Sequence, residues 1–148
     1  MLNEITVLDA LQNVIISDGN EYLPEGMTRL SRTNVLRDIP SVDNMPSDAA
    51  VYIVPDMSSN STKTMCSDES TLEATLTIIC KRDTHANLES KAYTYAYAIY
   101  RALRNNQSLN GVVSFTLPYE EQFYPEVEMN RNVQGLDVSV SISYEKDF

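Results

Sequence analysis

Residue types that enzymes use for catalysis are scattered along this chain and form no recognisable constellation. The only histidine, His85, lies in the segment Arg82-Asp83-Thr84-His85, just before a predicted helix. The sequence has no GxSxG, HExxH, EF-hand or glycine-rich phosphate-loop motif, and it has only 4 glycines. A metal site built on one histidine lacks a second imidazole, and Asp83 or Thr84 serves more simply as a helix N-cap. We therefore predict no metal, no cofactor and no enzymatic activity.

Carboxylates gather in a predicted loop, Pro118–Arg131. The loop carries these acidic and aromatic residues: Tyr119, Glu120, Glu121, Phe123, Tyr124, Glu126 and Glu128. Carboxylate oxygens suit divalent cations, but their spacing here matches no ligand motif. A solvated loop is the simpler interpretation. A small metal-dependent enzyme that uses this loop is kept as a distant alternative.

The net charge limits the choice of partners. The chain carries 21 acidic and 11 basic residues, a formal net charge of −10. A protein that holds nucleic acid needs a basic footprint to neutralise phosphates, and this composition argues against one. An acidic wall would let DNA pass without sticking, although solubility alone also explains the charge.

The two cysteines are predicted to be plain reduced thiols. Cys66 and Cys80 do not have CxxC spacing, and Cys80 falls at an inward position of a predicted strand. An inward cysteine behaves as a small apolar side chain.

A helix is predicted over residues 87–104. Its apolar residues recur at helical spacing and form one stripe expected to lie on a sheet: Leu88, Ala92, Tyr95, Ala96, Ile99 and Leu103. A second stripe beside it consists of Tyr93, Tyr97, Tyr100 and Arg104. Aromatic residues at this spacing are typical of a core edge, but tyrosine and arginine are also enriched in interfaces. The second stripe is therefore our candidate subunit interface, with the core-edge interpretation left open.

Alternating apolar and polar residues predict the strands. The last strand places Leu136, Val138, Val140, Ile142 and Tyr144 on one face and acids and serines on the other. Leu72–Lys81 repeats the pattern, which is typical of an antiparallel sheet with one solvated side. Ala49–Val54 is predicted as a buried strand near the sheet centre. Val112–Leu117 is predicted as a strand with Val113, Phe115 and Leu117 inward.

The remaining segments complete the predicted fold. Glu4–Ile16 is a helix with Asn3 as its N-cap and Asp18-Gly19-Asn20 as its stop, and a short strand is expected near Asn34–Leu36. Met57–Glu69 is a polar loop, expected as a hairpin tip or an arm that meets a partner. The fold class is α+β: a mostly antiparallel sheet of four to five strands with two helices packed on one face. The sheet is mixed if helix 87–104 makes a parallel crossover.

Length and composition indicate one domain over residues 1–148. The N-terminus lacks the basic residues of a signal peptide, and no apolar run reaches the length of a membrane span. We expect a soluble protein that is intracellular when made.

This order of elements resembles the tail terminator, or tail completion, proteins of long-tailed bacteriophages. The resemblance runs through the N-terminal helix, the segment Met45–Ile53, the strand Leu72–Ile79, the helix Leu88–Leu103 and the final Ser141–Glu145. It covers nearly the whole chain and rests on pattern and order, without a catalytic motif.

The resemblance implies a structural virion protein without enzymatic activity or cofactor. Its copies would form a hexameric homo-oligomeric ring that caps the tail tube, ends its polymerisation and presents a surface to the head-side connector or neck protein. DNA would pass through the lumen without specific binding, and assembly would take place in the bacterial cytoplasm, with no membrane involved. The two long loops supply candidate contacts to the tube or to neighbouring copies: Ser58, Asn60, Lys63, Tyr119, Glu120, Phe123 and Tyr124.

One alternative and one unexplained feature remain. Head completion and neck proteins share similar small α+β folds, so a head–tail joining protein is the first alternative. The basic stretch Arg29–Arg37 has no evident role in either interpretation.

Overall fold

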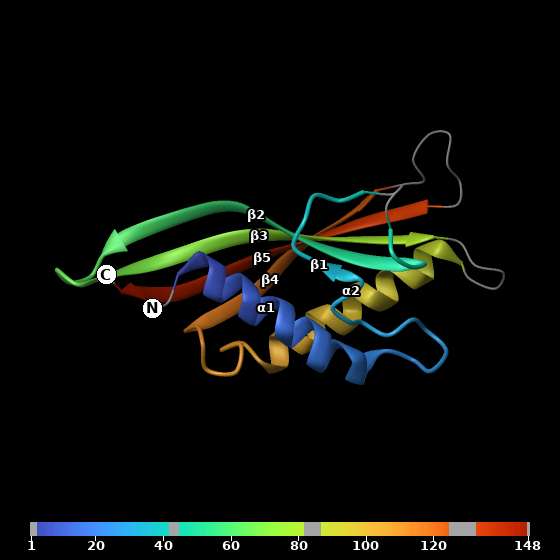
Figure 1. The fold of residues 1–148 in the computed structure, drawn as a ribbon, viewed down its shortest axis with the longest axis horizontal. Helices are drawn as coiled ribbons and strands as arrows, with labels where there is room; N and C mark the ends of the chain where they lie inside the picture. The colour runs from blue at the N-terminus through green and yellow to red at the C-terminus, as the bar shows by residue number, and fades with distance from the viewer. Residues whose placement is uncertain (1–2, 42–44, 82–86, 125–132, 148) are drawn as a thin grey trace.

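The computed structural model describes residues 3–41, 45–81, 87–124 and 133–147. In chain order the elements are α1 (Glu4–Gly19), η1 (Asn20–Tyr22), β1 (Val35–Leu36), β2 (Ala49–Thr62), β3 (Ser67–Lys81), α2 (Leu88–Asn105), β4 (Phe115–Tyr124) and β5 (Val133–Asp147). The strands form one five-stranded sheet in the order β1-β2-β3-β5-β4. Both α-helices pack on the same face of this sheet (Figure 1). The predicted α+β class is confirmed.

The sheet is mixed because one pair of neighbouring strands is parallel. β1 pairs with β2 in parallel, whereas all other neighbouring strands are antiparallel. β3 and β4 also run in the same direction, because each is antiparallel to β5, which lies between them. The connection through α2 is therefore the expected parallel crossover, with β5 inserted between the strands that it joins.

The main core lies between the helices and one face of the sheet. Across the central strands, Val51 is opposite Ile78, and Ile78 is opposite Leu136. The predicted inward positions of β5 and the apolar stripe of α2 are all buried, and Tyr95 is completely enclosed. The hydroxyl of Tyr95 donates a hydrogen bond to the carbonyl of Thr28, which satisfies its polar end.

Both helices begin at asparagine caps. The side chain of Asn3 accepts a hydrogen bond from the Thr6 amide, as predicted. α2 is capped by Asn87, whose side chain accepts from the amides of Glu89 and Ser90. The predicted caps Asp83 and Thr84, like His85, lie outside the described residues.

The predicted loop Met57–Glu69 is wrong over most of its length. β2 continues to Thr62 and β3 begins at Ser67, so only residues 63–66 form the turn of a long hairpin. The residues Ser58–Thr62 are exposed and polar throughout, so they lack the period of two that marks a half-buried strand. Backbone pairing with β3 supplies the order that the side chains do not indicate.

The prediction for β4 is wrong in length and, from Phe115 onward, wrong by one residue in phase. Val113 is buried as predicted but precedes the strand. Thr116 and Pro118 lie opposite the inward Ile142 and Val140, whereas Phe115 is 41% exposed. Leu109, Asn110 and Gly111 all have positive φ in the preceding turn, which delays the strand, and a one-residue shift moves every side chain to the other face. β4 then runs to Tyr124, so the first part of the predicted loop Pro118–Arg131 is strand. Residues 125–132 lie outside the described part of the chain.

The other face of the sheet is largely polar, and none of the described helices covers it. Its side chains are mostly small hydroxyls and acids: Thr71, Glu73, Thr75, Thr77, Asp137, Ser139, Ser141 and Ser143. A small apolar cluster around Tyr52 and Ile79 occupies one end of this face, where Tyr52 donates to the carbonyl of Ser41. None of the described helices has both the length and the apolar character needed to cross a bilayer.

Candidate functional site

The second stripe of α2 divides between two environments. Tyr93 is 42% exposed and stacks on Phe123 of β4, with ring centres 5.4 Å apart. Tyr97 is 58% exposed, and its ring does not stack on an aromatic ring of the described strands. Tyr100 is half-buried, and Arg104 is exposed. The structure thus brings Tyr93 together with Phe123 and leaves the C-terminal half of the stripe facing solvent.

The candidate contact residues of the hairpin are each held by another part of the chain. The hydroxyl of Ser58 donates to Glu4 at 3.2 Å, and Asn60 accepts from Ser70 at 2.6 Å. Lys63 forms an ion pair with Glu145 at 2.8 Å. These bonds fix the shape of the hairpin, which leaves its tip residue Met65 fully exposed.

The candidate residues on β4 include both exposed and engaged side chains. Tyr119 is 50% exposed at a β-bulge, and its neighbour Glu120 is exposed as well. The hydroxyl of Tyr124 donates to Asp137 on the polar face at 2.9 Å. Tyr119, Glu120 and, at 40% exposure, Tyr124 are therefore the β4 candidates that remain accessible.

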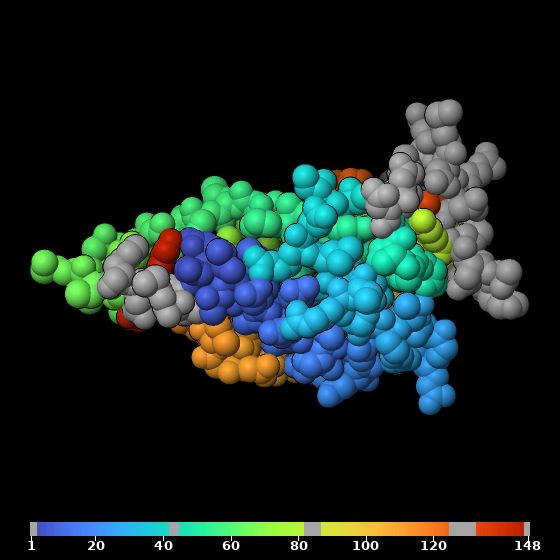
Figure 2. Space-filling view, viewed as in Figure 1, coloured from blue at the N-terminus to red at the C-terminus, as the bar shows by residue number. Residues whose placement is uncertain are grey.

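The two sets of candidates lie toward opposite ends of the sheet. The hairpin end of β3 pairs with the C-terminal end of β5, where Ser67 is opposite Asp147. Tyr124 instead pairs with Gly135 near the start of β5. In Figure 1 the hairpin forms the left end of the sheet, and Figure 2 shows its green residues narrowing to a tip beyond α1.

Two sheet edges are open among the described residues. β1 covers β2 only at Val51 and Tyr52, and the outer side of β4 has no strand partner. Both edge strands contain a proline beside a register shift, Pro55 in β2 and Pro118 in β4. Proline and bulges restrict indiscriminate strand pairing, which is how proteins control exposed edges.

A groove marks the point where the β2 edge becomes open. It measures about 230 Å³ and is lined by Arg37, Asp38 and Ile39 on one side and by Ile53, Val54 and Pro55 on the other. Ile39 is 78% exposed, which makes this an apolar position beside an unpaired backbone. Such a combination is suited to an added strand.

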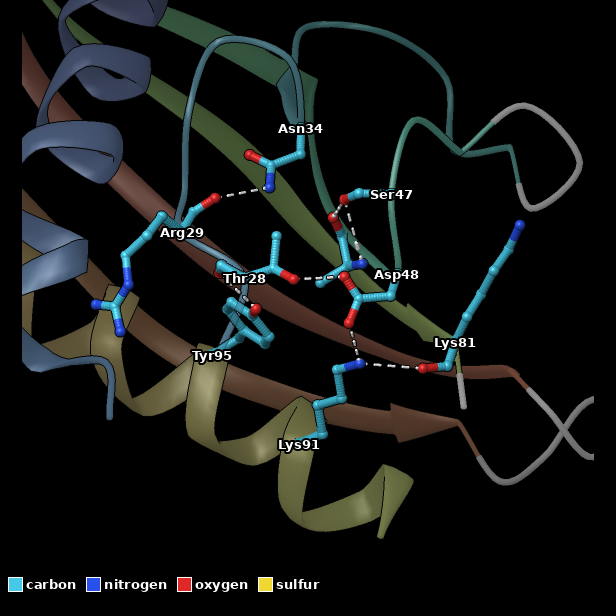
Figure 3. Close-up of polar contacts among 9 residues, drawn as sticks. Thr28, Arg29, Asn34, Ser47, Asp48, Lys81, Lys91 and Tyr95 are labelled. Carbon is cyan, nitrogen blue, oxygen red and sulfur yellow. Dashed lines mark hydrogen bonds and ion pairs between the residues drawn. The ribbon is translucent and has the colours of Figure 1, made fainter. Parts of the chain in front are cut away.

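A buried polar network joins α2 to the segment before β2 (Figure 3). Lys91 donates to Asp48 at 2.6 Å and to the carbonyl of Lys81 at 3.1 Å. Asp48 also accepts a hydrogen bond from Thr28 at 2.5 Å. Burial opposes the charge on Asp48, but the hydrogen bonds from Lys91 and Thr28 lower the pKa of its carboxyl below the usual value.

Sequence reasoning did not identify this network. The one available signal was that Lys91 lies three residues after Leu88 and four before Tyr95, on the apolar stripe, where a lysine must find a partner. Asp48 could not be assigned as that partner because it comes from a segment with no periodic pattern. The network connects three segments, and Thr28, Asp48 and Lys91 also line a pocket of about 220 Å³.

The described residues offer no metal site. Among them, no three or more His, Cys, Asp or Glu side chains are grouped so as to hold an ion. Cys80 is buried in the core, and this burial raises the pKa of its thiol to about 12, whereas Cys66 is exposed at the hairpin turn. Both are free cysteines, as predicted.

Comparison with known proteins yields a match of structure. No protein-family model matches the sequence, and no curated protein is significantly similar to it. A solved structure that matches is the sheath/tube terminator of PVC, an extracellular contractile injection system, in its extended state. The match covers 100% of this chain with a TM-score of 0.55 and 17% sequence identity.

The chain shares the fold of that terminator. It spans 58% of the length of the terminator chain, so the larger protein has additional parts with no counterpart here. The predicted resemblance to tail terminators is thus supported at the level of fold, by the terminator of an extracellular contractile injection system.

Proposed function

We propose that this protein is a structural subunit that terminates the tube or sheath of a phage tail or a phage-tail-like assembly. The observation that carries the proposal is the match, over the whole chain, to a sheath/tube terminator. The proposed role is to form a ring on the end of the growing tube, to stop its polymerisation and to present a surface to a head-side connector. Its partners are other copies of the chain and the tube or sheath proteins.

The open sheet edges suggest how copies join. β2 and β4 run in opposite directions, because each step across β3 and β5 reverses the strand. The outer side of β4 in one copy can therefore add to the free part of β2 in the next copy as an antiparallel neighbour. Such a head-to-tail contact uses two different surfaces, and it generates a closed ring when the rotation between copies fits.

The polar face of the sheet suits the inside of such a ring. The helices occupy the opposite face, and the exposed groups here are small hydroxyls with acids such as Glu73 and Asp137. Acids repel phosphates, so DNA or another anionic cargo would pass without binding. The acidic composition of the chain agrees with this orientation.

The hairpin and the exposed β4 residues remain candidates for contacts with the tube or with a neighbouring copy. Ser58, Asn60 and Lys63 act by holding the hairpin in shape, whereas Met65 at its tip is free to contact a partner. Tyr119 and Glu120 lie on the β4 edge proposed for ring closure.

The test combines solution mass with electron microscopy of negatively stained samples. The purified protein should form a ring, alone or on the ends of tail tubes, and loss of its gene should give overlong tubes or tubes that fail to join heads. Ile39→Asp should prevent ring formation, because it adds a charge to the β2 edge. Ile5→Asp is the matched control, since Ile5 is 62% exposed on α1.

A strictly monomeric protein that never decorates tube ends would refute the proposal. Normal tube lengths and normal particles without the gene would do the same. If rings form equally well with Ile39→Asp, the terminator role stands and closure through the β2 edge is wrong.

A further inference from the structure

Two Tyr–Arg pairs occupy the exposed side of α2, each with the arginine one helical turn after the tyrosine. The guanidinium carbon of Arg101 lies 5.9 Å from the ring centre of Tyr97, and that of Arg104 lies 6.0 Å from the ring centre of Tyr100. Arg101 is also 4.8 Å from the ring centre of Tyr22. Cation–π contacts hold both guanidinium groups in place. Less side-chain freedom then remains to be lost when a ligand binds.

These two arginines differ from the other described ones. Arg29 donates to backbone carbonyls, Arg32 donates to a side chain of α1, and Arg37 forms an ion pair on α1. Neither Arg101 nor Arg104 lies within ion-pair distance of a carboxylate in the described residues. Both guanidinium groups are thus exposed to solvent, and each lies over a tyrosine ring.

The sequence of α2 keeps this surface free of acids. From Ser90 to Asn105 the helix has no Asp or Glu, although the chain has 21 acidic residues against 11 basic ones. The only acid on α2 is Glu89 in the first turn. After its first turn, the exposed side of α2 itself therefore carries positive charge only, and the nearby Asp18 is engaged by the C-cap residue Asn106. A negatively charged ligand is directed to this side of the helix.

We propose that the surface formed by Tyr97, Tyr100, Arg101 and Arg104, the Tyr–Arg face, docks a carboxylate-bearing segment of another protein. The planar guanidinium binds a carboxylate through two parallel hydrogen bonds, and tyrosine and arginine are the residues that most often anchor protein interfaces. Nucleic acid is a poorer fit, because it requires a broader basic footprint than two guanidinium groups. The proposal does not depend on the ring, since this face belongs to the helix layer and not to either sheet edge.

Nuclear magnetic resonance with isotope-labelled protein tests the proposal. The probe is a short synthetic peptide of alternating glutamate and glycine, compared with an oligonucleotide of the same net charge. The peptide should shift the side-chain Nε–H signals of Arg101 and Arg104 in a saturable way, and those of Arg29, Arg32 and Arg37 should stay in place. Because these five of the seven arginines carry the same charge, the unmoved signals serve as an internal control.

Variants distinguish binding through the planar guanidinium group from non-specific attraction between opposite charges. Arg101→Lys with Arg104→Lys retains the charge and loses the planar fork, so the affinity for the peptide should fall about fivefold or more. Arg32→Ala is the matched control, because it removes one exposed positive charge elsewhere and should leave binding unchanged. Circular dichroism and thermal unfolding establish that each variant is folded, as expected for exposed positions.

Three results would overturn the proposal. The first is an equal response of all five arginines, which would mean non-specific attraction. The second is stronger binding of the oligonucleotide at the same positions. The third is a change in the sedimentation of the protein alone when Arg101 and Arg104 are replaced by alanine, which would identify the occupant as a second copy of this chain.

Discussion

The helix-covered part of the sheet and the projecting hairpin are built from the same strands but are held together in different ways. Under the helices, β3 and β5 alternate apolar and polar residues, and side chains such as Leu76 and Val138 are completely buried. In the hairpin, β2 is exposed from Pro55 to Thr62, and polar pairs such as Lys63 with Glu145 connect the strands. Apolar burial is worth much more per residue than an exposed ion pair. The helix-covered part therefore accounts for most of the free energy of unfolding, whereas the hairpin mainly provides a projecting surface.

This difference separates two kinds of mutational effect. Changes in the covered part should alter the free energy of unfolding, and changes in the hairpin should alter assembly with little effect on unfolding. The polar contacts between the hairpin and α1, through Glu4, form the link between the two regions. Each prediction below tests one side of this comparison or the link itself.

The largest effect is expected for Leu76→Ala. Leu76 is fully buried and lies between Ile53 on β2 and Val138 on β5. Its truncation should lower the free energy of unfolding by about 4 kcal/mol, because transfer and cavity terms add. Urea denaturation followed by circular dichroism measures the change.

The matched change in the hairpin is Ser61→Ala. Ser61 is an exposed residue of the same sheet, and its side chain makes no hydrogen bond within the described part of the chain, so the change should stay within about 0.5 kcal/mol. A loss comparable to that of Leu76→Ala would show that the hairpin shares the stability of the covered part, and the comparison would fail.

An intermediate effect is expected for Asp48→Ala. The side chain of Lys91 is 6% exposed and that of Asp48 is 33% exposed, so the substitution removes a carboxylate that pairs with a buried ammonium group. We expect a loss of about 2–3 kcal/mol, slightly below the usual range for breaking a buried pair because Asp48 is partly solvated. The double variant Asp48→Ala with Lys91→Met should recover part of this loss, as measured by a double-mutant cycle.

Asp38→Ala is the control for that cycle, since Asp38 is exposed and should change stability little. If the double variant is no more stable than Asp48→Ala alone, the ion pair is not the reason for the loss. The network would then matter mainly through the hydrogen bond from Thr28.

The same division explains how far the sequence predicted the fold. Where one face of a strand is buried, as from Leu136 to Tyr144, the period of two identified both the strand and its inward side chains. The apolar stripe of α2 was identified for the same reason. Where both faces are polar, as from Ser58 to Thr62, the order comes from backbone pairing with β3, the next strand of the hairpin. No alternation of apolar and polar residues indicates that pairing.

The candidate contact residues show a similar limit. Tyr97 and Arg104 were placed correctly on one side of a helix, because helical spacing alone decides it. The stacking of Tyr93 on Phe123 and the pairing of Lys91 with Asp48 depend on tertiary contacts between segments far apart in the sequence. The one-residue shift in β4 arose in a turn whose positive φ values no pattern of apolar residues reveals.

The smallest effect concerns the link between the hairpin and α1, and it depends on pH. Lys146 donates to Glu4 at 2.7 Å, and this hydrogen bond is the main reason why the pKa of Glu4 falls to about 2 from 4.5. Because the folded-state pKa is the lower one, the contribution to stability is complete above about pH 4.5 and is lost as the pH falls toward 2. Both side chains are partly exposed, so we expect no more than about 1 kcal/mol.

Glu4→Gln should therefore destabilise the protein slightly at pH 7 and much less at pH 2.5, where the parent has lost most of this contribution. The difference between the urea midpoints of parent and variant at each pH reports the contribution of Glu4. The contribution of Asp48 is the same in both proteins and cancels in this difference. Since Ser58 donates to the same carboxylate, amide hydrogen exchange in the hairpin end of β2 should also rise in the variant. Identical pH profiles for parent and variant would show that this contact does not join the hairpin to the helix-covered sheet, and the two regions would then be independent.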